Sequence, residues 1–335
     1  MIIPALKQAG QRQSRLDRML LILIVLLTSV FPVELFPNAP PPPKGIDGQY
    51  SGRQGQVLLV KVPLSEEATE VKGTFLDRTI PFFREVRSGE PAGYLGLVGI
   101  DMQDAPGTYE LAVTIKNGEQ PPKRLSYHVL VAKEKFAVEH LKLPKDKVDL
   151  DDKTLARWKL EQEQVRQALA DNSALRLWHS GFIEPVNGKR TGIFGSVRIL
   201  NGQPRNPHNG EDIGAPLGTD VAATNDGVVR LTVDHVFSGK GVFVDHGLGF
   251  YSMYFHLSEI LVRDGDLVKA GQSIGRVGAS GRATGPHLHW GVKLNGARVN
   301  PYALLDLPFK NGSAPDSAAS GSSSQVTPDA LSVKQ

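Results

Sequence analysis

The amino-acid sequence predicts a mainly β chain: an N-terminal immunoglobulin-like β-sandwich, a linker helix, and a second, compact antiparallel β domain. Two observations support this prediction. Short apolar runs that alternate with period two, separated by turn residues, fill residues 45–135 and again residues 177–308. Between them, one stretch changes to helical periodicity. The length agrees, because 335 residues exceed what a single core usually holds.

Residues 1–44 have the pattern of an export segment. Basic residues precede an apolar run over residues 19–30, and the Pro-rich stretch 40–43 follows as an extended linker. The run is shorter than the ~20 residues of a membrane-spanning helix, but no A-x-A cleavage site follows it. Two hypotheses therefore stand, a removed signal peptide and a retained membrane anchor. Both place the remaining chain across the cytoplasmic membrane, and absent cysteine with no wall-anchoring motif favours a periplasm.

The alternating pattern of residues 45–135 predicts the immunoglobulin-like sandwich. Leu111, Val113 and Ile115 fall on one face of a half-buried strand, and the run 125–131 alternates in the same way. No motif with catalytic or metal-binding spacing occurs in this region. A separate hypothesis is that this region acts as a wall-binding or inhibitory module.

Residues 136–176 predict a polar linker that contains one amphipathic helix over about residues 151–171. Its apolar stripe consists of Leu155, Trp158, Val165 and Leu169. The helix would either cover or position the groove of the next domain, or act only as a linker, and the sequence does not separate these hypotheses. Residues 309–335, which are rich in Ser, Ala and Gly, are predicted to be disordered.

Composition narrows the function of the compact β domain at 177–308. The net charge of +3 is too small and too evenly spread to indicate nucleic acid as a partner, although it suits an anionic cell-wall polymer. The chain has no cysteine, which excludes disulfides, a thiolate nucleophile and Cys-ligated zinc. Any metal site must use His, Asp or Glu, which favours a catalytic site over a structural one.

The motif GPHLHWG, at residues 285–291, places two histidines two residues apart. In a strand, His287 and His289 would project from one face while Leu288 enters the core. A single H-x-H pattern occurs by chance in many folds, so the pair alone is only a candidate for metal binding.

Two further motifs supply polar side chains in the same domain. In PHNGED, His208 and Asp212 are four residues apart, and the surrounding Pro and Gly favour a turn that enters a strand over a helix. In MYFHLS, alternation places Tyr254 and His256 on the polar face of a strand. His and Asp are ligands suited to zinc. His235 and His246 lack a second ligand at motif spacing and are interpreted as packing or surface histidines.

Four ordered motifs, HNGED, YFHLS, GDLVKAGQSIGRVGASG and TGPHLHW, together resemble the lysostaphin-type zinc endopeptidases that cleave peptide bridges in peptidoglycan. The resemblance covers roughly residues 180–305 and implies a shallow groove over a β core of barrel-sandwich type. NDGVV and GDLVKAGQSIG also resemble the hairpins of biotinyl and lipoyl carrier domains. That alternative needs an attachment lysine in an exposed hairpin tip, typically flanked by Met or Asp, which the sequence does not have.

The resemblance to the lysostaphin-type family implies roles for five residues. His208, Asp212 and His289 would bind one Zn²⁺ per chain, and His256 and His287 would be the catalytic pair. Three protein ligands leave zinc an open position, where the pKa of a bound water falls towards ~7. One of the two histidines would take the proton of this water. The sequence leaves open which one does.

The stretch GIFGSVRILNG lies just before the first ligand, where the family has a related FG-type turn. Phe194, Arg198 and Asn201 in this stretch are candidate substrate-binding residues, and Tyr254 is a candidate groove aromatic. Glu211 departs from the family, which more often has an apolar residue before the ligand Asp. It is interpreted either as a solvated strand position or as a residue that orients a ligand histidine.

The function implied is a zinc endopeptidase that acts on peptidoglycan stem peptides or cross-links. The alternative is a catalytically inactive cell-wall adaptor that activates a separate amidase, although such relatives usually lose ligands that this sequence retains. A regulatory protein of the cell envelope is a further possible partner. The scissile bond is not readable from the sequence.

Overall fold

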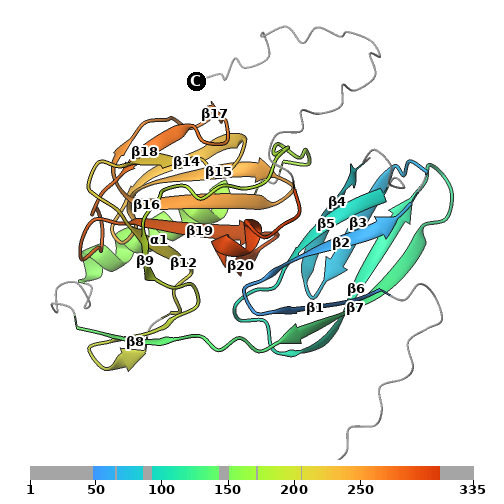
Figure 1. Cartoon of the computed structure of the whole chain (residues 1–335), viewed down its shortest axis with the longest axis horizontal. Coiled ribbons are helices and arrows are strands. Elements are labelled where there is room, and N and C mark those ends of the chain that lie inside the picture. Colours follow the sequence, from blue (N-terminus) through green and yellow to red (C-terminus); the bar gives the residue numbers. More distant parts are fainter. Residues whose placement is uncertain are drawn as a thin grey trace, which may run out of the picture. The chain divides into compact units, whose positions relative to one another are not determined.

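The computed structural model describes residues 48–64, 66–85, 93–142, 151–170, 173–204 and 206–309. Strands dominate these residues, and their α-helix is α1 (Asp152–Ala168) (Figure 1). The mainly β prediction is therefore confirmed. The expected export segment at 1–44 and all but the first residue of the expected tail lie outside the described residues. Within the described ranges, no helix has the length and apolar character needed to cross a membrane.

The first region is a seven-stranded sheet with the order β1-β7-β6-β3-β4-β5-β2. Its strands are β1 (Gln49–Arg53), β2 (Val57–Pro63), β3 (Glu70–Phe75), β4 (Arg78–Glu85), β5 (Gly93–Gly99), β6 (Gly107–Lys116) and β7 (Lys123–Ala132). Alternation along β6 buries Leu111, Val113 and Ile115 in an apolar core. The period-two pattern does not reveal β1, which pairs with β7 in parallel. The immunoglobulin-like classification of this sheet stays a prediction.

The second region is a ten-stranded sheet whose main path runs β17-β14-β15-β16-β19-β12-β9. These strands are β9 (Lys189–Gly192), β12 (Gly210–Gly214), β14 (Gly227–His235), β15 (Gly239–Gly247), β16 (Phe250–Ile260), β17 (Leu267–Val268) and β19 (Leu288–Leu294). The remaining strands, β13 (Asp220–Ala222), β18 (Ser273–Val277) and β20 (Ala297–Val299), pair beside this path. A 3₁₀ helix, η2 (Pro301–Leu304), follows β20. Ile213, Val242, Leu257, Leu288 and Trp290 are fully buried in the core of this sheet.

A small three-stranded sheet joins the predicted linker to the second region. β8 (Val138–Leu141) pairs in parallel with β10 (Val197–Leu200), which pairs with β11 (Gln203–Pro204). The predicted polar connection at 136–150 therefore contains a strand. Local periodicity does not show it, because its pairing partner lies about 60 residues away along the chain.

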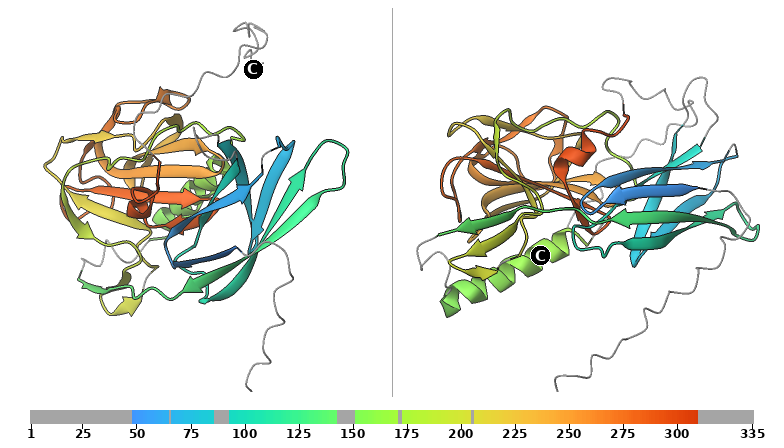
Figure 2. Two further views of the ribbon diagram at one scale, coloured as in Figure 1. Left: turned by 45° about the vertical axis from the view of Figure 1, so that its right-hand side comes forward. Right: turned by 60° about the horizontal axis from the view of Figure 1, so that its bottom comes forward.

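Helix α1 packs on the ten-stranded sheet (Figure 2). Asp151 caps it by accepting a hydrogen bond from the Thr154 backbone N–H. From the predicted stripe, Val165 and Leu169 contact a cluster of Leu231, Val233 and Phe243. The helix is thus a packed element of the second region, in contact with β14, as well as a connection.

Candidate metal centre

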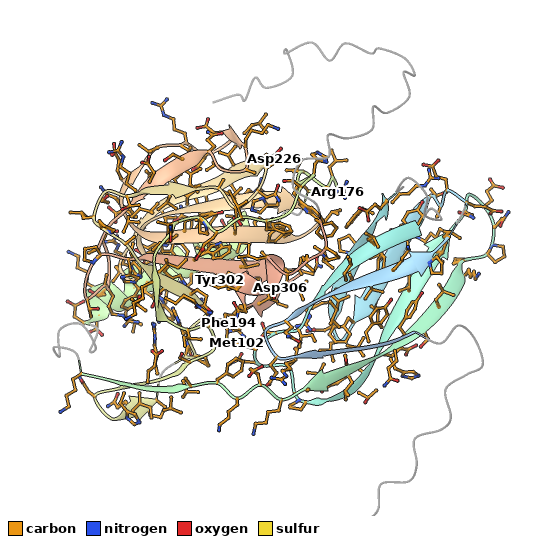
Figure 3. All side chains as sticks on the ribbon, in the orientation of Figure 1. Met102, Arg176, Phe194, Asp226, Tyr302 and Asp306 are labelled. Atoms are coloured by element: carbon orange, nitrogen blue, oxygen red, sulfur yellow. The ribbon has the colours of Figure 1, made fainter. Side chains whose placement is uncertain are left out.

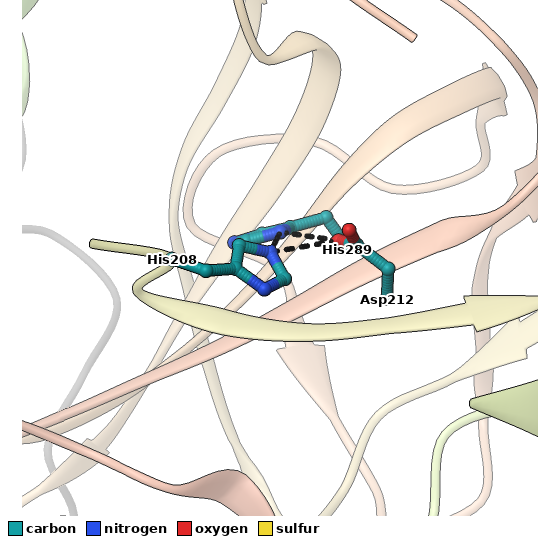
Figure 4. Close-up of side chains that lie close together, drawn as sticks. All are labelled: His208, Asp212 and His289. Atoms are coloured by element: carbon teal, nitrogen blue, oxygen red, sulfur yellow. Dashed lines mark hydrogen bonds and ion pairs between the residues drawn. The ribbon is translucent and has the colours of Figure 1, made fainter. Parts of the chain in front are cut away.

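Three side chains converge at strands β12 and β19. His208 lies just before β12, and Asp212 of β12 pairs with His289 of β19. Asp212 Oδ1 lies 3.0 Å from His208 Nε2 and 2.8 Å from His289 Nδ1, and these two nitrogens are 3.0 Å apart (Figure 4). All three residues are buried. Their donor atoms therefore face one point, and among the described residues they form a group that could hold a metal ion.

The hydrogen bonds around this cluster fit a cation. His208 Nδ1 lies 3.1 Å from the Ile193 carbonyl oxygen and donates its hydrogen there, which leaves the Nε2 lone pair facing Asp212 and His289. Two imidazole nitrogens and a carboxylate oxygen in mutual contact can share one cation between them. Two nitrogens and one oxygen in this arrangement match the donors of a catalytic zinc site with an open position.

The ionisation states of the cluster also suit metal binding. Burial would raise the pKa of the Asp212 carboxyl, but its close contacts with His208 and His289 outweigh burial and hold the pKa below its usual range. Burial lowers the pKa of His289. At neutral pH, Asp212 is therefore a carboxylate and His289 a neutral imidazole, and these are the forms that bind a metal.

Two more histidines lie beside the cluster. His287 Nε2 is 3.8 Å from Asp212 Oδ1, and the ring centroids of His256 and His287 are 4.7 Å apart. His256 Nδ1 donates to the Ser280 carbonyl at 2.9 Å, and His287 Nδ1 donates to the Gly285 carbonyl at 2.8 Å. Because the backbone engages Nδ1 in both rings, Nε2 is the ring nitrogen that each histidine offers for proton transfer. Burial lowers the pKa of His256 to about 3, so this ring is neutral at neutral pH.

His256 reaches the cluster through an irregular backbone. Its φ is +63°, and the pairing register of β16 shifts on either side of it. The His256 N–H donates to the Ser238 carbonyl in the β14–β15 turn. Alternation along a regular strand would put Tyr254 and His256 on the same face, but Tyr254 is fully buried. The prediction that Tyr254 and His256 share the polar face of a strand is therefore wrong. The left-handed backbone conformation of His256 breaks the alternation and leaves its ring beside that of His287.

Helix α1 supports the turn that holds His256. The buried Glu161 accepts hydrogen bonds from the Val236 N–H, and Arg157 donates to the Asp234 carbonyl. These contacts join the helix to the end of β14 and to the β14–β15 turn. Of the two hypotheses for the helix, positioning of the site is the one that these contacts favour.

Comparisons with known proteins place this site in a family. Residues 206–301 match the sequence pattern of Peptidase family M23. Peptidoglycan DD-endopeptidase ShyA of Vibrio cholerae is 47% identical over 94 residues, which are 28% of this chain and 22% of that protein. DD-carboxypeptidase/endopeptidase Mpg of Neisseria meningitidis is 40% identical over 124 residues, which are 37% of this chain and 28% of that protein.

A crystal structure from Pseudomonas aeruginosa that is assigned to peptidase family M23 extends the likeness. It is 31% identical to this chain, with a TM-score of 0.56, over 74% of this chain and 92% of that one. The chain belongs to peptidase family M23. The predicted resemblance to the lysostaphin-type family is thereby confirmed. This M23 chain matches only between a fifth and a third of the length of the curated relatives named above.

The four predicted substrate-binding residues of this M23 chain lie in different surroundings. Phe194, labelled in Figure 3, is 3% exposed and packs against the ring of Phe136. Tyr254 is buried and accepts a hydrogen bond from the Thr224 N–H. Asn201 is exposed in the β10–β11 turn with a φ of +50°. Arg198 contacts Asp212 of the candidate metal centre, through a hydrogen bond from Nη2 to Oδ2.

Glu211 has a supporting role that the sequence does not reveal. It is fully buried, and both of its oxygens accept hydrogen bonds from Arg190, at 3.0 and 2.5 Å. The Phe194 N–H also donates to it at 3.2 Å. Glu211 thus holds the turn whose Ile193 carbonyl fixes the His208 ring. The interpretation as a solvated strand position is wrong. No local signal could identify the pair, because Arg190 lies 21 residues away.

Proposed function

We propose that this M23 chain is a zinc-dependent endopeptidase that hydrolyses peptide cross-links of peptidoglycan. The observation that carries the proposal is the convergence of His208, Asp212 and His289 beside His256 and His287, whose Nδ1 atoms both face backbone carbonyls. The similarity to ShyA and Mpg, which are named as peptidases, supports the reaction class and the substrate. An inactive adaptor is disfavoured, because the ligand set and both neighbouring histidines are present.

Each residue would contribute a defined part of the chemistry. Zinc held by three protein ligands lowers the pKa of a water molecule to about 7 and polarises a carbonyl group. His256 and His287 each present an Nε2 that can take a proton from water as its oxygen attacks the scissile carbonyl carbon. The same imidazole then gives that proton to the leaving amine as the C–N bond breaks. While protonated, the imidazole stabilises negative charge on the carbonyl oxygen.

The proposal sets requirements for the rest of the chain. Peptidoglycan lies outside the cytoplasmic membrane, so residues 1–44 would direct export to the periplasm, as a cleaved signal or as an anchor. Residues 45–135 would form a separate β domain, residues 136–176 a linker with α1, and residues 177–308 the peptidase domain. A regulatory partner in the cell envelope would act on this assembly.

Mass spectrometry of the products tests the proposal. The full chain, loaded with zinc, is incubated with purified peptidoglycan beside a chelator-treated sample, a His289→Ala variant and a His128→Ala variant. His128 lies on β7 in the first region and provides a matched control. We expect cleaved cross-links from the wild type and from His128→Ala, and none from the other two samples. A folded, zinc-loaded wild type that releases no fragment would contradict the proposal.

A further inference from the structure

Arg198 joins the metal ligands to the linker strand. On β10, its side chain donates from Nη2 to Asp212 Oδ2 at 2.9 Å and from Nε to Glu139 Oε2 at 3.3 Å. Glu139 lies on β8 and is the register partner of Arg198 in the parallel β8–β10 pair. Both Arg198 and Glu139 lie outside the M23 match at 206–301. The contact therefore extends the site to residues that the family pattern does not cover.

The Arg198 contact divides the two oxygens of Asp212 between different partners. Oδ1 faces His208 and His289, whereas Oδ2 faces the guanidinium group. Gly192 packs against the same carboxylate, because a Cβ there would collide with Oδ2. The carboxylate is thus held from its outer side by a charge and by a close backbone contact, with one oxygen left towards the metal point.

Glu139 completes the arrangement by holding Arg198. A guanidinium group that donates from Nε to one carboxylate and from Nη2 to another is held at two of its three nitrogens, so it loses little freedom when Asp212 binds a metal. Glu139 also offsets the positive charge that Arg198 brings close to the metal point. The side chains of Arg198 and Glu139 are 28% and 26% exposed, so solvent does not fully screen the pair.

We propose that Arg198 is a positioning residue that holds Asp212 as a one-oxygen zinc ligand, and that Glu139 of the linker strand holds Arg198 in place. This inference rests on the proposed function, which supplies zinc as the metal. It differs from the substrate-binding role predicted for Arg198. A residue that binds substrate would affect KM and leave zinc affinity unchanged, whereas a positioning residue changes zinc affinity itself.

Zinc affinity of the full chain, measured by competition with a chromophoric chelator, tests the inference without an activity assay. The variants are Arg198→Ala, Arg198→Lys and Glu139→Gln. The control is Arg276→Ala, whose guanidinium pairs with Asp220 and Glu259 on the surface. We expect Arg198→Ala to bind zinc at least about tenfold more weakly, as is usual when the hydrogen-bond partner of a metal ligand is lost. Arg198→Lys keeps one charged donor, so its zinc affinity should fall less than that of Arg198→Ala. Glu139→Gln should show the smallest fall in zinc affinity. The control should bind zinc as tightly as the wild type.

Absorption spectra of the Co²⁺-substituted proteins give a second readout. A change of Asp212 from one-oxygen to two-oxygen binding alters the coordination number, so the visible bands of Arg198→Ala should lose intensity relative to the wild type. Wild-type zinc affinity in all three variants would overturn the inference. If Arg198→Ala does not fold, unchanged affinity in Arg198→Lys and Glu139→Gln overturns it equally. A wild type that binds no zinc would instead count against the proposed function.

Discussion

The seven-stranded sheet and the ten-stranded sheet are both built from alternating strands around apolar cores, yet they differ in the polar groups that they bury. In the described part of the first region, Asp101 is the buried charged side chain, and it pairs with Arg298 of β20. The second region buries His208, Glu211, Asp212, His246 and His289 among others. Burying such groups costs free energy unless each has a partner. The buried polar groups are therefore concentrated in the region that holds the candidate metal centre.

The largest difference between the two regions is expected when a predicted metal ligand is removed from the second one. We expect His208→Ala to lower cross-link hydrolysis by more than about 10³-fold, since the metal contributes several kcal/mol to the transition state. Bound zinc per chain, measured by elemental analysis, should fall in parallel. Retention of both zinc and activity in this variant would remove the distinction between the two regions.

A core substitution in the first region should lower stability and leave zinc binding unchanged. Leu111 is fully buried in the core of the seven-stranded sheet. We expect Leu111→Ala to lower the free energy of unfolding by about 2–5 kcal/mol, because it leaves a cavity. Denaturant unfolding measures that loss, and chelator competition should give wild-type zinc affinity. Weaker zinc binding in a folded Leu111→Ala protein would break the comparison.

The pH dependence of stability tests a buried polar group of the second region that lies outside the candidate metal centre. His246 donates from Nδ1 to the Asp226 carbonyl, and its Nε2 contacts the Ser252 hydroxyl, both at 2.7 Å. Burial lowers its pKa to about 4. Below the unfolded pKa of about 6.5, the unfolded chain takes up a proton that the folded protein cannot, so stability falls as the pH falls towards 4.

The size of this effect follows from the two pKa values. From pH 6.5 to pH 5, His246 should account for a loss of about 2 kcal/mol of unfolding free energy, and the loss should end below the folded pKa. Other buried histidines, such as His235, add to the total. The difference between the wild type and His246→Gln in urea titrations isolates this residue. Parallel pH profiles of the two proteins would show that His246 is not buried as described.

The smallest effect is expected for a surface ion pair. Glu163 of α1 accepts hydrogen bonds from Arg166, which lower the pKa of its carboxyl to about 2. Water screens this exposed pair, so Glu163→Gln should leave Tm and zinc affinity unchanged. Glu161→Gln on the same helix alters a buried carboxylate and should lower Tm. Equal Tm values for these two variants would show that the contact between α1 and the β14–β15 turn does not contribute to thermal stability.

Short-range patterns predicted the parts of the site that depend on spacing within one short segment of the chain. H-x-H gives His287 and His289 with Leu288 buried between them, and H-x(3)-D gives His208 and Asp212. The β-bulge at His256 could not be predicted, because the turn at Ser238 and the carbonyl of Ser280 determine it.

Pairings between segments that are far apart along the chain could not be predicted either, because local patterns do not contain the partner. Strand β8 and the contact between Glu139 and Arg198 join segments 59 residues apart, and the pair of Glu211 with Arg190 joins two other strands. Strand β8 lies in a polar stretch, and Glu211 is a fully buried carboxylate on a strand. Both have a local sequence pattern that is typical of solvent-exposed residues. Their burial follows from partners that the pattern does not contain.

The left-handed backbone of His256 has a consequence for how this position can change during evolution. A side chain in that conformation costs about 1 kcal/mol, which glycine avoids and asparagine reduces. In a lineage that no longer needs the imidazole, mutation would drift towards these two residues, because either relieves strain. Glycine or asparagine at this position would therefore be the expected mark of a relative that no longer uses the imidazole.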